Sequence, residues 1–344
     1  MPENYGNVRD EYDALRESAA LLDFSPAGKL EVSGKNAVQF VNGLVTNDVK
    51  ALQVGEGVLA AFLNVQGKVV ALGRFYQTGT GLLIETEPER REVIFKNLSR
   101  FVPAGDFSVN DASGNYALLS LQGPRAALLL ASFAGGPVEI ETEYRLVERE
   151  VEGFKLLIAS HWRCGGTGYD LFIPTGAKEP VWQRLIDEGA RPAGRAAFEV
   201  ARVEAGIPRE GADVTESNIL LEAGLEKAVS YTKGCYLGQE VIARIHWRGQ
   251  PAKQLRGLLV EAAQPPGPGT ELHSAEGKKI GEITSSVRSW ALDRVIALGY
   301  VHRYYLTPGT AFTLKSGGAE VGRATVAELP FVQPQPQSNP NQHE

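Results

Sequence analysis

Cysteine is almost absent from this chain, which holds only Cys164 and Cys235 among its 344 residues. Two cysteines so far apart do not form the disulfide framework of a small secreted protein. An iron–sulfur cluster usually takes about four cysteine ligands, so this chain cannot hold one unaided. A disulfide between the two cysteines would need the fold to bring their Cα atoms within about 7 Å. The scarcity therefore predicts a reducing compartment, the cytoplasm, and no metal site of the chain's own.

Long apolar runs and an excess of positive charge are also missing. No segment approaches the roughly 18 uninterrupted apolar residues of a membrane-spanning helix, and the first residues lack the pattern of a secretory signal. The formal net charge of −6 argues against a dedicated nucleic-acid binder. At 344 residues, the chain is long enough for two or three domains with substantial cores. We therefore expect a globular cytoplasmic protein without a membrane or nucleic-acid partner.

The first 250 residues alternate irregularly between helical and strand patterns. Apolar residues recur at helical spacing over 8–22, from about residue 35, after Pro88 and over 195–205. Segments rich in β-branched and aromatic residues predict strands at 57–64, 69–77, 82–86, 116–121 and 169–173, and a hairpin over 144–160. Such irregular alternation favours an α+β architecture over a doubly wound parallel sheet.

The pattern changes after Pro251. Glycine- and proline-rich turns separate short strand patterns at 255–261, 279–286, 295–301, 310–315 and 320–328. This pattern of short strands and turns predicts a small β-barrel or β-sandwich domain over residues 251–329. Residues 330–344 have little apolar surface to bury, so we expect a disordered tail there.

The segment Lys233–Arg244 concentrates the features of a chemical site. A short helix is expected to begin near Gly238, with Cys235 just ahead of its N-terminus, where unpaired N–H groups favour negative charge. Basic residues dominate from 233 to 256, with Glu240 as the single acid. The surroundings therefore favour a reactive thiolate at Cys235.

The same features would suit an anionic ligand. Such a ligand could pair with Lys233 or Arg244 and stack on the ring of Tyr236. A plainer interpretation stays open, in which Gly234, Cys235 and Tyr236 form a tight turn and the basic residues are a solvated face.

The run Lys233–Arg244 resembles the signature of the YgfZ family, folate-binding and iron–sulfur-related cousins of the glycine-cleavage aminomethyltransferase, or T-protein. Further segments resemble parts of that family in the family's order: Gly43–Val49, Phe62–Gly67, Ser120–Pro124, Gly168–Phe172, Arg202–Pro208 and Glu222–Glu226. The likeness extends from about residue 8 to residue 328.

The resemblance implies an aminomethyltransferase-like fold. Residues 1–250 would form two interlocked α+β subdomains around a channel for tetrahydrofolate, closed by the C-terminal barrel. It also implies functional residues. Cofactor-binding positions would be Arg202, Lys233, Tyr236, Gln239 and Arg244. Cys235 would be the working thiol of a factor that assembles or repairs iron–sulfur clusters in client enzymes, which together with assembly proteins would be its partners.

Two departures separate this chain from the aminomethyltransferases. Ala71 and Leu72 stand where those enzymes have an aspartate pair, and Gly166 stands near the place of their pterin-contacting glutamate. Loss of a positioned carboxylate typically slows an acid–base step by about 10²–10⁴-fold. We therefore lean toward a factor with little or no enzymatic activity.

Two alternatives stay open. A folate-dependent one-carbon (aminomethyl) transferase or demethylase would need another carboxylate near the folate, such as Asp48 or Asp170. A scaffold whose barrel docks a partner would keep the folate channel only as a vestige.

Overall fold

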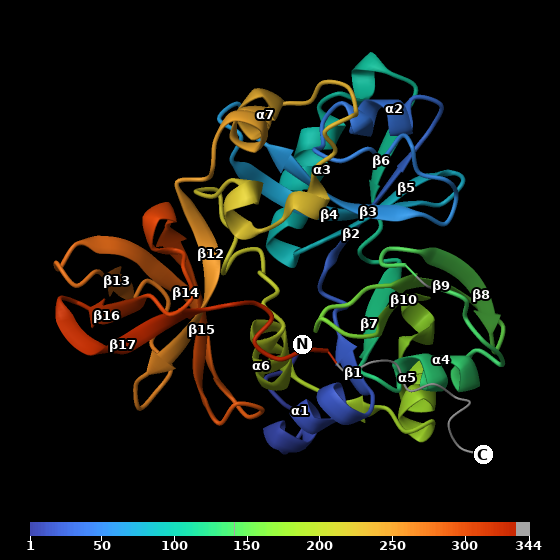
Figure 1. Ribbon diagram of the computed structural model, residues 1–344. Helices are drawn as coiled ribbons and strands as arrows, with labels where there is room; N and C mark the ends of the chain where they lie inside the picture. Colours follow the sequence, from blue (N-terminus) through green and yellow to red (C-terminus); the bar gives the residue numbers. More distant parts are fainter. Residues whose placement is uncertain (141, 335–344) are drawn as a thin grey trace.

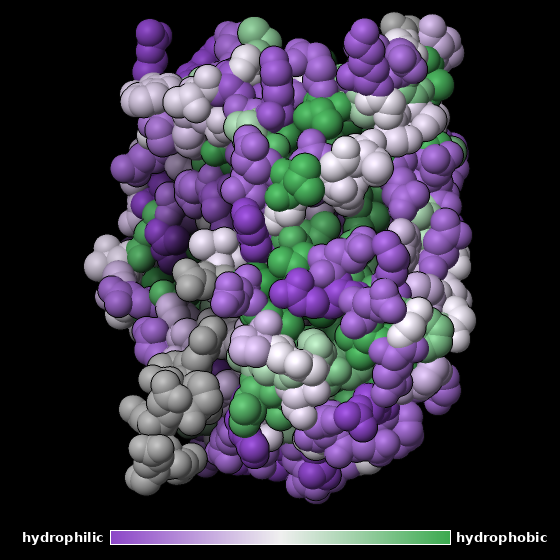
Figure 2. Space-filling view, turned by 90° about the vertical axis from the view of Figure 1, so that its right-hand side faces the viewer, coloured by the Kyte–Doolittle hydropathy of each residue, from purple (hydrophilic) through white to green (hydrophobic). Residues whose placement is uncertain are grey.

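The computed structural model describes residues 1–140 and 142–334. Figure 1 shows a five-stranded sheet at the upper right, a six-stranded sheet at the lower right and a closed barrel at the left. Figure 2 shows the side on which the two sheets face the viewer, where apolar side chains gather in the middle of the face and hydrophilic ones surround them. Helices, open sheets and barrel together confirm the predicted α+β architecture with a C-terminal barrel.

The five-stranded sheet is antiparallel throughout. One face is covered by helices α2 (Ala37–Asn42) and α3 (Arg91–Ser99), whose apolar residues share a core with the sheet. Alternate strand residues point to the other face, as a two-residue period requires. In spatial order the strands are β3 (Gly57–Leu63), β4 (Val69–Gln77), β5 (Gly81–Thr86), β2 (Gly28–Ser33) and β6 (Ser108–Asp111).

The six-stranded sheet is antiparallel except for the pairing of its first two strands. Helices α4 (Ala126–Phe133) and α5 (Lys178–Asp187) pack on its outer face. Its inner face shares a second core with the five-stranded sheet, so the two sheets interlock. In spatial order the strands are β11 (Arg191–Pro192), β1 (Ala20–Asp23), β7 (Tyr116–Gln122), β10 (Gly168–Pro174), β9 (Phe154–Ser160) and β8 (Leu146–Val151).

The predicted helix over residues 8–22 is too long. Helix α1 runs from Val8 to Glu17, and strand β1 begins at Ala20. Residues 20–22 are buried and contribute to two different cores, because side chains on opposite faces of the strand meet different neighbours. The sequence pattern of a short apolar run that is buried on both faces is the same for a central strand and for the end of a helix. The predicted helix was therefore extended into β1.

The barrel is closed by six strands rather than the five predicted. The missed strand, β13, spans only Glu271–His273, which is too short for an alternating pattern to stand out. Helix α6 (Arg195–Glu204) joins the barrel to the sheets, since Val203 packs with Leu298. In spatial order the strands are β12 (Lys253–Glu261), β15 (Arg294–His302), β14 (Lys279–Ser289), β13, β16 (Ala311–Ser316) and β17 (Ala319–Ala327).

The chain beyond the barrel returns to α6. The Phe331 N–H donates to the Glu204 carbonyl, and the Phe331 ring lies among the apolar residues of the barrel base. The rest of the predicted disordered tail, residues 335–344, lies outside the described residues.

Short 3₁₀ segments make several of the connections: η1 (Pro88–Arg90), η2 (Val102–Ala104), η3 (Thr175–Ala177), η4 (Leu220–Ala223), η5 (Glu226–Ala228) and η6 (Arg303–Tyr305). Across the described ranges, the helices are too short or too polar to cross a membrane.

Helix α7 (Gln239–Arg248) sits on the hairpin between β3 and β4. It begins after Gly238, whose φ of +80° places it in the left-handed region. A Cβ on Gly238 would lie 2.6 Å from the Asn64 carbonyl oxygen and 3.0 Å from the Gly67 Cα atom. Glycine at this point therefore permits both the turn and the close approach of two backbones.

Candidate functional site

A cavity of about 510 Å³ lies where the two sheets meet α6 and the loop that follows it. Both halves of the first 250 residues contribute to its wall, as does the segment 224–227. Its volume falls within the usual range for small-molecule sites, roughly 300–1,000 Å³. Apolar residues form part of the lining: Phe24, Ala27, Leu59, Phe198, Ile207 and Leu225.

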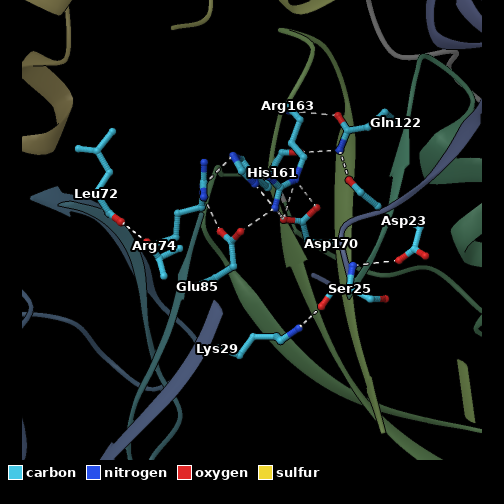
Figure 3. A network of polar contacts seen from close by, with 12 residues as sticks. Asp23, Ser25, Lys29, Leu72, Arg74, Glu85, Gln122, His161, Arg163 and Asp170 are labelled. Atoms are coloured by element: carbon cyan, nitrogen blue, oxygen red, sulfur yellow. Dashed lines mark hydrogen bonds and ion pairs between the residues drawn. The ribbon is translucent and has the colours of Figure 1, made fainter. Parts of the chain in front are cut away.

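A network of buried charges forms the polar part of the wall (Figure 3). Arg163, from the loop before β10, makes a two-pronged contact with Asp170, at 2.9 Å from Nε to Oδ1 and 2.6 Å from Nη2 to Oδ2. A second Arg163 contact reaches Glu85 at 3.3 Å, and Arg74 bonds the other Glu85 oxygen. His161 lies between the two arginines and completes the network.

The histidine in this network is held in one neutral form. Its Nδ1–H donates to Asp170 at 2.8 Å, and its Nε2 accepts from Arg74 Nε at 3.2 Å. Burial, together with the positive charges of Arg163 and Arg74, lowers the pKa of His161 to about 4. The imidazole is therefore uncharged at neutral pH.

The two carboxylates of the network stay ionised. Burial alone would raise the pKa of Glu85 and of Asp170, but the neighbouring guanidinium groups outweigh it, and both pKa values lie below the ordinary range. Asp170, which the sequence analysis offered as a possible acid–base group, is fully buried and fully engaged with Arg163 and His161. It does not appear among the cavity-lining residues that the structure describes.

Glu210 is the cavity carboxylate in the most unusual setting. Both of its oxygens lie 3.1 Å from the Leu72 backbone nitrogen, whose N–H they accept. Its nearest cation, Arg90, is 3.4 Å away and binds Glu216 more closely, at 2.7 Å. Burial raises the pKa of Glu210 to about 8, against the smaller opposing effects of the Leu72 N–H and Arg90.

The structure places Arg202 on the cavity but also ties it to the barrel. The side chain is 1% exposed. Its guanidinium donates to Asp213 at 2.8 Å and to Ser285 of β14 at 2.8 Å, and it pairs with Glu199. Arg202 is the one predicted cofactor-binding residue among the described cavity-lining residues.

The remaining predicted residues lie apart from the cavity, near α7. Lys233 is buried, and its ammonium donates to the carbonyls of Asn42, Val45 and Asn47. Burial lowers its pKa to about 8, with Asp48 opposing the shift. The lysine therefore fastens the loop after α2 to the segment before α7.

The neighbours of Lys233 in the signature face different surroundings. Tyr236 is buried in the core shared by the two sheets, and burial raises its pKa to about 12. Gln239 is the first residue of α7, and Arg244 is an exposed residue that pairs with Glu240 one turn earlier. Direct ligand contacts by these residues stay a prediction.

The two cysteines are free and differently placed. Cys235 is exposed, just ahead of α7 as predicted, but outside the lining of the cavity in the described structure. Cys164 is buried, and its burial raises the pKa of the thiol to about 12. A functional role for Cys235 stays a prediction.

Sequence reasoning missed most of the cavity. Asp48, the other carboxylate considered, accepts from the backbone of Lys50 and Ala51 in a surface turn and does not line the cavity in the described structure. Glu210 was not singled out, although an acid directly after Ile207-Pro208-Arg209 is a visible signal. Within the described ranges, no group of three or more metal-ligating side chains comes together.

Comparisons with known proteins bear on the whole chain. A family model described as the GCVT N-terminal domain matches residues 1–233, and one described as the glycine cleavage T-protein C-terminal barrel domain matches residues 253–333. The aminomethyltransferase of Rubrobacter xylanophilus is 32% identical over 88% of this chain and 81% of its own. The probable aminomethyltransferase of Natronomonas pharaonis is 32% identical over 97% of this chain and 93% of its own.

A solved structure agrees with these matches. The glycine cleavage system aminomethyltransferase T of Bartonella henselae superposes with a TM-score of 0.88 at 25% identity, covering 98% of this chain and 93% of that one. The comparisons therefore confirm the predicted fold.

The same comparisons correct the predicted branch of the family. The sequence analysis expected the YgfZ type and a part in iron–sulfur cluster assembly, with client and assembly proteins as partners. The relatives from Rubrobacter, Natronomonas and Bacillus subtilis all carry the name aminomethyltransferase, as does the Bartonella structure. They support the transferase alternative, and the iron–sulfur prediction is wrong.

Proposed function

Because the chain belongs to the glycine cleavage T-protein family, we propose that it is a folate-dependent transferase that moves a one-carbon unit from an amine donor onto tetrahydrofolate. Tetrahydrofolate is the cofactor of this family, as the sequence analysis expected. The observation that carries the proposal is the cavity at the junction of the two sheets, with its buried charges and the buried carboxyl group of Glu210.

The cavity fits a folate by size and by chemistry. Its volume of about 510 Å³ can enclose a pteridine ring together with part of the aminobenzoyl group. Phe24 and Phe198, 5.4 Å apart between ring centroids, offer an apolar wall for the flat ring system. The guanidinium of Arg163 lies 4.1 Å from the centroid of the Phe24 ring, so polar and aromatic groups alternate on this wall.

The rim of the cavity supplies positive charge for the glutamate tail of a folate. Arg195 and Lys227 line the cavity and are 62% and 56% exposed. Arg195 pairs with Glu3, and Lys227 pairs with Glu143. Because both basic side chains are exposed, solvent weakens these ion pairs. A carboxylate ligand can therefore compete for these side chains at little cost.

Inside, the protein contributes fixed charge and orientation. Arg74 and Arg163 are held by buried partners, among them neutral His161, so the positions of their guanidinium groups are fixed before a ligand arrives. Preorganised donors of this kind act strongly where water is excluded. Tetrahydrofolate supplies the nucleophilic nitrogen that accepts the one-carbon unit.

The proposal is tested by a transfer assay. The purified protein is incubated with tetrahydrofolate and an aminomethyl donor labelled with ¹³C in the transferred carbon, and label in methylenetetrahydrofolate is followed by NMR. We expect enzyme-dependent transfer that rises with protein concentration. Tetrahydrofolate binding without transfer from any aminomethyl donor would contradict the proposed function.

A further inference from the structure

We infer that Glu210 is the proton-transferring residue of this site and stands in for the carboxylates that the chain lacks at Ala71 and Leu72. The inference rests on the proposed function and deepens it by naming the acid–base group. Glu210 comes from the loop after α6, 138 residues from Leu72 in sequence. Its carboxyl group nevertheless binds the backbone at this point of β4.

The contacts of Glu210 place its carboxyl group at the cavity without a close ion pair to a cation. Glu210 lines the cavity, and its side chain is 4% exposed. The Leu72 N–H fixes its position without supplying a full charge. The nearest guanidinium, that of Arg90, is held more closely by Glu216.

Four other acids of the wall are paired with cations. Glu85 is bound by Arg74 and Arg163, and Asp23 pairs with Lys178 at 2.7 Å. Glu143 pairs with Lys227, and Glu199 is shared by Arg202 and Arg209. Glu87 and Glu89 also line the cavity, and the negative charge of Glu87 favours the neutral form of Glu210. Glu210 is the acid whose carboxyl group is fixed on the backbone at Leu72.

A carboxyl group in this setting can both give and take a proton near neutral pH. Its pKa of about 8 leaves it mostly protonated at pH 7, close to the value that suits acid–base catalysis. When the bond between the donor nitrogen and the transferred carbon breaks, the electron pair stays on the donor nitrogen, which takes the Glu210 proton. The first folate nitrogen that bonds the carbon releases its own proton to the carboxylate, and the carboxyl group is thus restored. When the second folate nitrogen bonds the same carbon, the substituent that the carbon still carries leaves with its electron pair and takes the proton of that nitrogen. No oxidant or reductant is needed.

The test is the Glu210→Gln variant, whose side-chain oxygen can still accept from the Leu72 N–H. Glu92→Gln, an exposed glutamate on α3, is the matched control. We expect one-carbon transfer by Glu210→Gln to fall about 10²–10⁴-fold, while calorimetric affinity for tetrahydrofolate stays within about threefold. The wild-type rate should fall above about pH 8, as Glu210 loses its proton.

A second measurement does not depend on activity. Because the folded-state pKa lies above the ordinary 4.5, the native protein keeps a proton between about pH 4.5 and 8 that the unfolded chain has released. This group therefore makes stability fall as pH rises through that window. Denaturant unfolding at pH 5 and pH 8 should show a smaller loss for Glu210→Gln than for the wild type or Glu92→Gln.

The outcomes separate the two claims. Unchanged transfer by Glu210→Gln beside an active wild type overturns the role of Glu210 and leaves the proposed function intact. Equal pH dependence of stability in the variant and the wild type also overturns it, because the carboxyl group would then titrate normally. A wild type that binds tetrahydrofolate but transfers nothing overturns the proposed function and the inference with it.

Discussion

Arg163 illustrates how single residues shape this site. The chain places its guanidinium, which is 4% exposed, between two carboxylates and over an aromatic ring. Taking such charges out of water is costly, and only good geometry with full hydrogen bonding compensates for the loss of hydration. The cavity wall is therefore polar and rigid at once, since each charge depends on its partners.

Replacement of Asp170 by asparagine should destabilise the protein strongly. Asp170 is fully buried, and its loss leaves Arg163 with only the longer contact to Glu85. Breaking a buried ion pair on one side typically costs about 3–5 kcal/mol. Denaturant unfolding should show a loss of this size for Asp170→Asn.

The control is Asp13→Asn, which removes an exposed contact between Asp13 and Arg9 on α1. Exposed pairs contribute about 0–1 kcal/mol, so this variant should unfold close to the wild type. Equal stability of the two variants would show that the buried network is not a stabilising unit.

At the scale of elements, the packing of α7 depends on one backbone contact. The helix begins directly after Gly238, and the Gly238 backbone touches the β3–β4 turn at Asn64 and Gly67. A side chain at either glycine would meet backbone or the branched Cβ of Val241, neither of which yields easily. The close packing of the β3–β4 turn against the start of α7 therefore requires glycine at both Gly67 and Gly238.

We expect Gly238→Ala to lower the free energy of unfolding by about 2 kcal/mol, since both the left-handed φ and the 2.6 Å approach to the Asn64 oxygen oppose a methyl group. Gly234→Ala is the matched control, because a Cβ there meets nothing within 4 Å. Thermal unfolding of both variants is the measurement. A Gly234→Ala variant as unstable as Gly238→Ala would refute this account of the helix start.

Regular elements of this protein could be predicted from the sequence, whereas their long-range contacts could not. Alternation of apolar residues marked most barrel strands, but the three residues of β13 carry no such period. The absence of an acid at Ala71 and Leu72 was visible in the sequence. The acid that occupies this place, Glu210, was not, because only the tertiary fold brings it to β4. The three carbonyl partners of Lys233 were not visible in the sequence for the same reason, since they lie 186 to 191 residues away.

At the scale of the whole molecule, the cavity lies where the two sheets and α6 meet, because their side chains do not fill this junction. The inner faces of both sheets share one core. Helix α6 packs against β1 in a separate core and contacts the barrel through Arg202 and Val203. The barrel therefore supports the wall of the cavity from behind. Loss of this support should affect ligand binding even without a change inside the cavity.

The most direct test is calorimetric titration of tetrahydrofolate into the wild-type protein and into Ile207→Trp. This substitution replaces an aliphatic side chain of the cavity lining with a bulky indole ring. Val65→Trp, at a 73% exposed position that is not among the described lining residues, controls for the added tryptophan. We expect the wild type and Val65→Trp to bind one folate per chain with equal affinity, and Ile207→Trp to bind at least about tenfold more weakly, a loss of about 1.4 kcal/mol. Equal binding by all three proteins, or none by the wild type, would contradict the assignment of this cavity to tetrahydrofolate.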